Sequence, residues 1–418
     1  MRGDYRQDVA AWVEPELDEA LVPARLDTSQ RLVRVELDEQ LLPGLPDTIT
    51  LDLIAPKIPL KEIVSTMPSV SKGWQHVIRS RQVYDARVRS NAKEEFIILN
   101  RYFSRRNRYS TALYFPKQKA CCYLPPLPQL RRGFPHYCQY VALHGRIYVL
   151  GGEDEYHHGT RMGFEMGSSY VFVLDLYGPS QWKTCAHMRA GRVNFGCGIL
   201  DGKIYVFGGY HCDESFTLSE VYDPEVDTWS EIKSIPTLRS HHKVITVGED
   251  LFVYGGTIYE ETNMEGSGEG HFLTGGNALG KAFFVEIYNP VLDEWSSMDP
   301  FLEDERAKVL LVGGKLHAIQ EFDVYVYDFE EYCWKLLHTP LFPTLGPEDS
   351  LRITLLDAIA VNGEVLIRVS ATDTGACLLR SRGFGSNNEK LVWEYADGGP
   401  SLRGITCVKS EFRALGEL

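Results

Sequence analysis

The run His211-Cys212-Asp213-Glu214 is the densest group of metal-ligating residue types in the chain. Imidazole, thiolate and carboxylate groups are the usual zinc ligands in proteins, so this run would suit a metal-dependent activity. Consecutive residues cannot all direct their side chains at one ion without a tight loop, however. The pairs His157-His158 and His241-His242 have no complementary Cys or His spacing, and neither a G-x-S-x-G motif nor a phosphate-binding loop occurs. We therefore predict no catalytic residue, no metal site and no cofactor.

The elements that would position a functional residue are indicated by a short string that ends in two glycines. Its copies are RIYVLGG (146–152), KIYVFGG (203–209) and LFVYGG (251–256). Between copies runs a Tyr-Asp-Pro or Tyr-Asn-Pro turn followed by tryptophan, as in YDPEVDTW (222–229) and YNPVLDEW (288–295). The spacing is regular, because 26 residues separate Trp182 from Gly208 and again Trp229 from Gly255. One supersecondary unit is therefore repeated, which indicates a propeller or a solenoid.

Each repeat predicts several short antiparallel strands, because β-branched and aromatic runs alternate with turn residues. The glycine pair suits an inner strand near a central channel, and the tyrosine and tryptophan suit packing between units. Glu321 and Phe322 stand at the next expected glycine pair, and YDFEEYCW (327–334) keeps the Tyr-to-Trp spacing. The predicted fold is mainly β, a six-bladed propeller over residues 94–410 with an insertion at 258–281. Residues 94–99 are expected to close the final blade as a strand from the other terminus.

Composition bounds the partners and the compartment. The net charge of −14 leaves no basic stripe of the kind that binds phosphate, so we expect no nucleic acid and no membrane partner. The N-terminus is charged where a signal peptide is apolar, which favours a cytoplasmic and/or nuclear protein. The nine cysteines contain no CxxC pair and are predicted to be reduced thiols. Residues 1–40 are acidic with few aromatics, and we expect them to be disordered.

Residues 45–78 break from the strand pattern. Pro46 with Asp47 suits a helix start, and Pro56, Pro59 and Pro68 divide the stretch into short helices. The apolar residues at helical spacing are Leu45, Ile49, Leu53, Ile54, Ile58, Val70, Trp74, Val77 and Ile78. A segment of roughly 40 residues cannot bury all of this surface alone. A partner for it is therefore predicted.

The glycine pair, the tyrosine and the tryptophan resemble the kelch repeat, and residues 41–86 resemble an F-box. The F-box pattern of Leu-Pro, a spaced aliphatic helix, a second aliphatic-proline turn and Val-Ser-Lys-x-Trp is matched by Leu45-Pro46, Ile49 with Leu53 and Ile54, Ile58-Pro59, and Val70-Ser71-Lys72 with Trp74. Pro56 and Gly73 depart from the pattern. The layout is similar to plant kelch F-box proteins that direct phenylpropanoid and flavonoid enzymes to degradation.

This resemblance implies a substrate receptor of an SCF-type, cullin–RING E3 ubiquitin ligase. The F-box would dock on a Skp-family adaptor, and the propeller would hold a target protein for ubiquitination and degradation. The chain itself would perform no chemistry. The expected adaptor-binding residues are Leu45, Pro46, Ile49, Leu53, Ile54, Ile58, Val70, Trp74, Val77 and Ile78.

A target would bind through loops at one mouth of the channel, and equivalent loops can be found by counting. Fourteen residues before the first glycine of each pair stand Tyr137, Asn194 and His241, and the analogous count from Glu321 reaches Ala307. Arginines cluster near these positions and would suit acidic side chains on a target. The predicted substrate-binding residues are Arg131, Arg132, Tyr137, Arg192, Asn194, Arg239, His241, Glu305, Arg306 and Arg403. The insertion at 258–281 is expected to be a mobile arm away from this ring.

Two other classes of protein remain open at this point. A kelch propeller enzyme with a metal site would need clustered ligands at one channel mouth and would leave the helical segment without a role. A kelch scaffold would bind a partner without any ligase role. Co-purification with a Skp-family adaptor separates both alternatives from the receptor.

Overall fold

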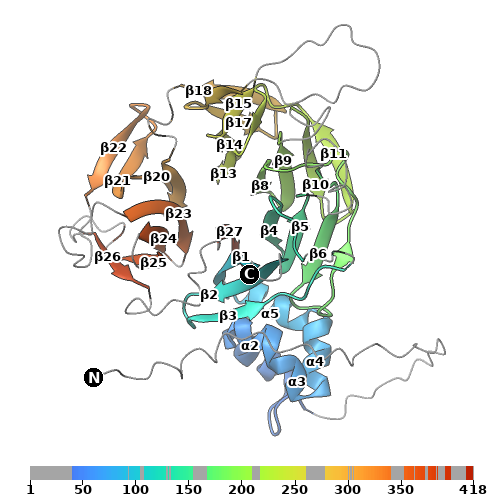
Figure 1. Cartoon of the computed structure of the whole chain (residues 1–418). Coiled ribbons are helices and arrows are strands. Elements are labelled where there is room, and N and C mark those ends of the chain that lie inside the picture. The colour runs from blue at the N-terminus through green and yellow to red at the C-terminus, as the bar shows by residue number, and fades with distance from the viewer. Residues whose placement is uncertain are drawn as a thin grey trace.

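The computed structural model describes residues 40–92, 94–103, 108–128, 130, 133–153, 167–209, 217–259, 278–299, 301, 304, 306–339, 353–361, 363–371, 375–382, 384, 391–396 and 411–417. Figure 1 shows these residues as a ring of small sheets around a central opening, with short helices packed at the outer edge. Within these ranges no helix is long and apolar enough to cross a membrane.

Short helical elements come first in the described chain. They are α1 (Asp47–Ile49), η2 (Thr50–Ile54), η3 (Ala55–Lys57), α2 (Leu60–Ser65), α3 (Met67–Val70), α4 (Lys72–Arg79) and α5 (Gln82–Arg89). Pro46 precedes α1, Pro59 precedes α2, and Pro68 lies in the first turn of α3, so the predicted division by prolines is confirmed. Ser71 caps α4, because its side chain accepts a hydrogen bond from the backbone N–H of Trp74 at 3.1 Å.

The described strands form six four-stranded antiparallel sheets, which confirms the six predicted blades. Blade 1 holds β27 (Glu411–Glu417), β1 (Glu95–Phe103), β2 (Arg108–Phe115) and β3 (Ala120–Tyr123); blade 2 holds β4 (Gln139–Leu143), β5 (Arg146–Leu150), β6 (Val171–Asp175) and β7 (Lys183–Thr184); blade 3 holds β8 (Gly196–Leu200), β9 (Lys203–Phe207), β10 (Ser219–Asp223) and β11 (Thr228–Ile232). Blade 4 holds β13 (Lys243–Val247), β14 (Asp250–Tyr254), β17 (Val285–Asn289) and β18 (Glu294–Met298); blade 5 holds β19 (Lys308–Val312), β20 (Lys315–Gln320), β21 (Asp323–Asp328) and β22 (Cys333–His338); blade 6 holds β23 (Ile353–Val361), β24 (Glu364–Ala371), β25 (Gly375–Arg382) and β26 (Val392–Tyr395). A three-stranded ribbon beside blade 4 holds β12 (Arg239–Ser240), β15 (Thr257–Tyr259) and β16 (Ala278–Lys281).

Blade 1 is built from both ends of the described chain. Its strand β1 pairs with β2 on one side and with the C-terminal strand β27 on the other. Strand β27 also contacts β4 and β23, the inner strands of blades 2 and 6 (Figure 1). Strand pairing between the ends therefore closes the ring, but the N-terminal chain supplies three strands and the C-terminal chain supplies the innermost one. The boundary expected at residue 410 falls short of this strand, because closure requires β27.

Each motif tryptophan ties its blade to the preceding one. The indole Nε1 of Trp182, Trp229 and Trp295 donates to a backbone carbonyl just after the last strand of the blade before, at 2.7 to 2.9 Å. The motif aspartate adds a second link in blade 3: Asp227 Oδ1 accepts from the Tyr222 hydroxyl at 2.6 Å and from the backbone N–H of Ala186, in the connection leaving blade 2, at 2.8 Å. Asp293 repeats this arrangement in blade 4. The predicted structural role of these residues is confirmed.

The glycine pairs turn the chain at the end of the second strand of a blade. All six glycines have positive φ, from 52° at Gly208 to 102° at Gly209. A Cβ atom at Gly256 would lie 2.4 Å from the carbonyl oxygen of Ser240, so a side chain does not fit there. In blade 5, Glu321 and Phe322 have φ of 47° and 81°, so they keep the left-handed turn without glycine. This confirms their predicted equivalence to the pair.

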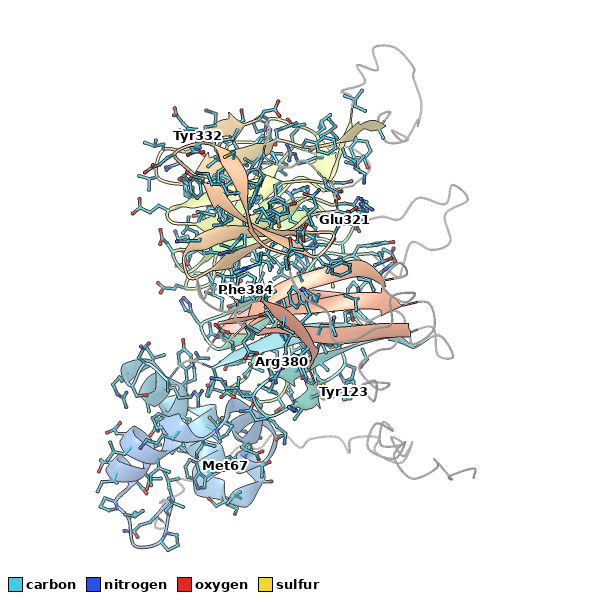
Figure 2. All side chains as sticks on the ribbon, turned by 90° about the vertical axis from the view of Figure 1, so that its left-hand side faces the viewer. Met67, Tyr123, Glu321, Tyr332, Arg380 and Phe384 are labelled. Atoms are coloured by element: carbon cyan, nitrogen blue, oxygen red, sulfur yellow. The ribbon has the colours of Figure 1, made fainter. Side chains whose placement is uncertain are left out.

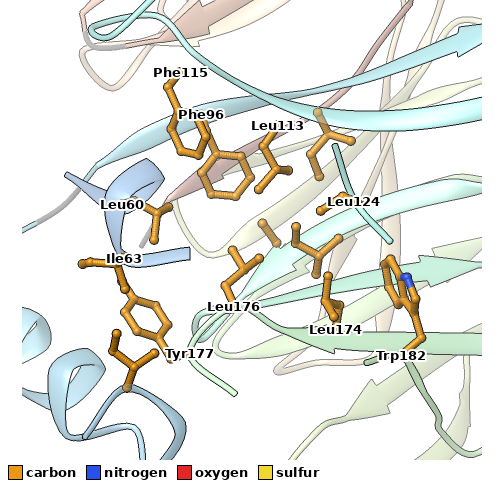
Figure 3. Packing of buried hydrophobic residues seen from close by; sticks show 14 of the residues in the cluster. Leu60, Ile63, Phe96, Leu113, Phe115, Leu124, Leu174, Leu176, Tyr177 and Trp182 are labelled. Atoms are coloured by element: carbon orange, nitrogen blue, oxygen red, sulfur yellow. The ribbon is translucent and has the colours of Figure 1, made fainter. Parts of the chain in front are cut away.

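The helical segment shares one hydrophobic core with blades 1 and 2. Leu60 and Ile63 of α2 belong to the same buried cluster as Phe96 and Phe115 of blade 1 and Tyr177 of blade 2 (Figure 3). The segment was expected to be unable to bury its apolar residues alone; the propeller buries some of them, and others stay exposed. The propeller supplies the surface that a segment of this length cannot provide by itself.

The ring has two different faces. We call the side with the short turns inside each blade the turn face, and the side with the glycine pairs and the connections between blades the loop face. Figure 2 separates them: Tyr332, in a turn of blade 5, marks the turn face, and Glu321 marks the loop face. The helices lie toward the turn face, since Arg81 donates to the backbone oxygen of His144 in the first turn of blade 2.

Asp227→Ala is predicted to lower the free energy of unfolding by about 2 kcal/mol, because the buried Tyr222 hydroxyl and the Ala186 N–H both lose their acceptor. Urea unfolding followed by tryptophan fluorescence measures the effect. Glu225→Ala, an exposed position in the same turn, is the matched control and should change stability by less than about 0.5 kcal/mol. Equal effects of the two substitutions would contradict the link between blades.

Candidate functional site

Part of the predicted adaptor-binding set lies on the surface of the helical segment. Leu45, Ile49, Leu53 and Val70 are 36%, 41%, 60% and 59% exposed, and Pro46 is exposed beside them in the sequence. We call these five residues the exposed apolar set. Large aliphatic side chains exposed this far on one short segment are suited to contact with another protein. Ile54 and Ile58, also predicted to bind the adaptor, are half-buried.

The remaining three predicted adaptor residues are buried. Trp74, Val77 and Ile78 of α4 belong to the core shared with blade 1, and Trp74 Nε1 donates to the carbonyl of Leu41 at 3.1 Å. The prediction that these three residues contact the adaptor directly is wrong, because their side chains are buried within the chain. They determine where α3 and the exposed apolar set lie. Helical spacing alone cannot separate the two faces of so short a helix.

Two ion pairs fix the helical segment on the propeller. Arg87 of α5 pairs with Glu94 at 3.2 Å, both side chains are buried, and Glu94 also accepts from the Leu60 backbone N–H at 2.7 Å. Arg81 pairs with Asp175 of blade 2 at 2.5 Å. A buried charge-assisted network is geometrically specific, so the exposed apolar set has a defined direction relative to the blades.

The loop face brings together the three residues found by counting. Tyr137, Asn194 and His241 each have positive φ and each lie two residues before the inner strand of a blade. Asn194 N–H donates to the Tyr137 carbonyl at 3.4 Å, and His241 N–H donates to the Asn194 carbonyl at 2.7 Å. The Tyr137 and His241 rings meet edge to face at 6.4 Å. The connections between successive blades thus form a continuous rim at the channel mouth.

Arg192 and Arg239, predicted to contact a target, are instead fully buried. Arg192 pairs with Glu220 at 2.8 Å and Arg239 with Glu286 at 2.6 Å. Burial lowers the pKa of both guanidinium groups and raises the pKa of Glu286. An arginine stays charged in proteins, so blades 3 and 4 each enclose an ion pair. The expectation of partner contact at these two residues is corrected.

The paired glutamates were missing from the predicted site. Both stand two residues before the motif tyrosine, as Glu220 before Tyr222 and Glu286 before Tyr288. A glutamate that is buried inside a blade needs a cationic partner. In both blades this partner is the arginine that stands four residues before the first strand of the blade. The recurrence of this arginine and this glutamate at the same positions in two successive repeats is the sequence signal that could have identified the pairs. Arg192 also accepts at its backbone carbonyl from Gly152 N–H at 2.8 Å, which links blade 2 to blade 3.

Of the other five predicted substrate-binding residues, the structure describes one. Arg306 is exposed and lies two residues before β19, so it is the equivalent of His241 in blade 5. Its guanidinium pairs with Asp304 and Glu321, each at 3.2 Å. The remaining residues, Arg131, Arg132, Glu305 and Arg403, lie outside the described residues.

The insertion leaves and rejoins the propeller at the loop face. Its ends, β15 and β16, pair with one another, and β15 pairs with β12 immediately before His241. The Tyr259 hydroxyl lies 2.9 Å from the Ser240 hydroxyl. The expectation that the insertion lies away from the ring is therefore wrong, because the glycine pair and the connections between blades share one face. Residues 260–277 lie outside the described residues.

His242, next to the rim, is buried between blades 3 and 4. Its Nε2 donates to the Phe207 carbonyl at 3.0 Å, and its ring occupies the space that a Cβ at Gly196 would need. Burial, and then the charge of Arg239, lower its pKa from 6.5 to about 3. The described residues contain no group of three or more His, Cys, Asp or Glu side chains that could hold a metal ion.

Comparison with known proteins finds a matching family model, similar curated proteins and a similar solved structure. The kelch-motif family model matches residues 191–236, which include blade 3. F-box/kelch-repeat protein At1g67480 of Arabidopsis thaliana is 27% identical over 85% of this chain and 86% of its own length. F-box/kelch-repeat protein SKIP30 of Arabidopsis thaliana is 32% identical over 50% of this chain and 57% of its own length. A solved structure titled "Structure of YjhT" covers 61% of this chain and 84% of its own, with 16% identity and a TM-score of 0.41.

The six repeated sheets with their glycine pairs and motif tryptophans define a kelch β-propeller that carries a helical segment before its first strand. Relatives named as F-box/kelch-repeat proteins cover between 50% and 85% of this chain. The chain is similar to plant F-box/kelch-repeat proteins in its repeat and, for one of these relatives, over most of its length.

Stability is predicted to fall in mild acid because of His242. The folded-state pKa is below the unfolded value, so its contribution is complete above pH 6.5 and is lost as the pH falls from 6.5 toward 3. The loss amounts to about 1.4 kcal/mol for each pH unit in that window. Urea unfolding at several pH values measures it. His242→Gln, which keeps a donor for Phe207, should give a flatter dependence; parallel curves for both proteins would contradict the assignment.

Proposed function

We propose that this protein is the substrate-recognition subunit of an SCF-type, cullin–RING E3 ubiquitin ligase. The observation that carries the proposal is the placement of the exposed apolar set. It lies on helices that are held by buried contacts toward the turn face, whereas the longer connections of the propeller lie on the loop face. A receptor needs two separate binding surfaces in a fixed relation, and this arrangement supplies them.

The exposed apolar set is the proposed contact with a Skp-family adaptor. Fully burying one leucine or valine side chain contributes about 1.5 to 3 kcal/mol, so a few such residues suffice for a stable contact when an adaptor covers them. The resemblance of residues 41–86 to an F-box and the names of the relatives support this choice of partner.

The loop face is the proposed site for the target protein, which would be ubiquitinated and degraded. Its rim of Tyr137, Asn194 and His241 and the base of the insertion provide aromatic and polar groups around the channel mouth. The target class that the resemblance favours is a metabolic enzyme such as those of phenylpropanoid metabolism. In this proposal the chain is non-catalytic and acts in the cytoplasm, the nucleus or both.

Leu53→Asp is predicted to weaken binding of a Skp-family adaptor at least about tenfold, because it puts a charge where an apolar side chain would be buried. Pull-down with a purified adaptor and a titration of its affinity measure the effect. The matched control is Val226→Asp, which changes an equally exposed residue in a turn of blade 3. The melting temperatures of both variants should match that of the unchanged protein.

Trp74→Ala tests the indirect role of the buried residues. It should destabilise the helical segment by about 3 to 5 kcal/mol and weaken adaptor binding through loss of structure. Normal adaptor binding by Leu53→Asp, or an equal loss in Val226→Asp, would refute the proposed adaptor surface.

A further inference from the structure

The inner strands of blades 2 to 6 place one residue each at the same height in the channel wall. Each of these residues lies four positions before the end of the first strand of its blade, where that strand turns into the second. They are Gln139, Gly196, Lys243, Lys308 and Asp357. Three of the five are charged, and two of those three are lysines. The height is close to the loop face, because Lys243 and Lys308 are the first residues of their strands.

Side chains at this height reach toward the next blade. In blade 2, Gln139 Nε2 donates to the Phe195 carbonyl of blade 3 at 2.7 Å. Residues two apart in a strand point to the same side, so Lys243 shares its side with Ile245, which packs in a cluster with Val309 of blade 5. By the same rule Lys308 shares its side with Leu310, which packs against blade 6. The two lysine side chains therefore leave the sides of β13 and β19 that face the next blade.

Neither ammonium has a partner among the described residues. No ion pair within 4 Å and no hydrogen bond joins Lys243 or Lys308 to a described group, although Lys308 is half-buried. Burial lowers the pKa of Lys308. A half-buried cation without a directly bound counter-ion loses hydration that a more distant carboxylate compensates only in part, so an anion supplied from outside would be bound favourably.

The charges around these lysines are mainly positive. Asp357 interacts with Lys243, Lys308 and Arg368 together, so one described carboxylate faces three cations. Asp304, which also lies near Lys308, is paired with Arg306. Lys281 at the base of the insertion adds a further positive charge, since it and Lys243 both act on His241. This local excess contrasts with the net charge of −14 for the chain.

We propose that Lys243 and Lys308 bind carboxylates of an acidic segment of a partner protein that enters the channel mouth from the loop face. The inference rests on the proposed function and names the chemistry of its target. Lysine ammonium groups on two successive blades suit a segment that carries several carboxylates. Asp357 in blade 6 repels such a segment and so limits it to the blade 4 and blade 5 side.

Binding of a fluorescein-labelled oligoglutamate peptide to the full-length chain tests this site by fluorescence anisotropy, with oligoglutamine of equal length as the control peptide. Lys243→Gln and Lys308→Gln should each weaken oligoglutamate binding about tenfold, the loss of one charge-assisted hydrogen bond. Asp357→Asn should tighten it. Lys315→Gln removes an exposed lysine at the turn face of the same blade as Lys308 and should leave the affinity unchanged.

Equal affinity for the two peptides, or an equal loss in Lys315→Gln, would overturn the proposal. Inorganic phosphate that binds more tightly than the peptide and loses affinity in the same two lysine variants would overturn the protein partner in favour of a small anion. If Lys308→Gln lowers the melting temperature, the exposed Lys243 decides the result. The assay contains no adaptor, so its failure is distinct from failure of the adaptor pull-down.

Discussion

The hydrogen bond from each motif tryptophan to the preceding blade is the interaction on which the rest of the structure depends. It joins Trp182, Trp229 and Trp295 to carbonyls just after the last strand of the blade before, so blades 2, 3 and 4 are each positioned by the preceding blade. Where the motif aspartate is present, its carboxylate adds a link to a backbone N–H and satisfies a buried tyrosine hydroxyl. In blade 5, Tyr332 stands where the aspartate would be, and the Tyr327 hydroxyl instead contacts the sulfur of Met298 at 3.8 Å.

Two arginines and two lysines of the propeller differ in whether a carboxylate pairs with them directly. Arg192 and Arg239 enter the blades and are neutralised there by Glu220 and Glu286, so they stabilise the turn after the second strand. Lys243 and Lys308 lie at the start of inner strands, where no described carboxylate pairs with them directly. The planar guanidinium suits an enclosed ion pair with several hydrogen bonds, whereas an ammonium group is a mobile point charge that suits an exchangeable ligand.

The helical segment packs on the propeller because it is too short to form a hydrophobic core of its own. Its short helices cannot bury their own apolar side chains, and blades 1 and 2 offer Phe96, Phe115 and Tyr177 as the missing surface. The buried Arg87–Glu94 pair then removes freedom at the junction. The residues left outside this core, with Leu53 the most exposed, become the surface available to a partner. Packing of the segment on the propeller and exposure of the binding surface are thus two results of the same constraint.

By itself the sequence was enough to predict the repeat, the six blades, the equivalence of Glu321 and Phe322 to a glycine pair, and the rim positions Tyr137, Asn194 and His241, because these depend on local spacing that recurs along the chain. Tertiary structure alone decided which side chains are buried and which terminus closes the ring. Arg192 and an exposed arginine look alike in sequence, and the difference lies in Glu220, which is 28 residues away. Strand β27 joins β1 across most of the chain, and the counter-charge with the larger effect on Lys308, Asp357, comes from blade 6, so no local pattern could contain either fact.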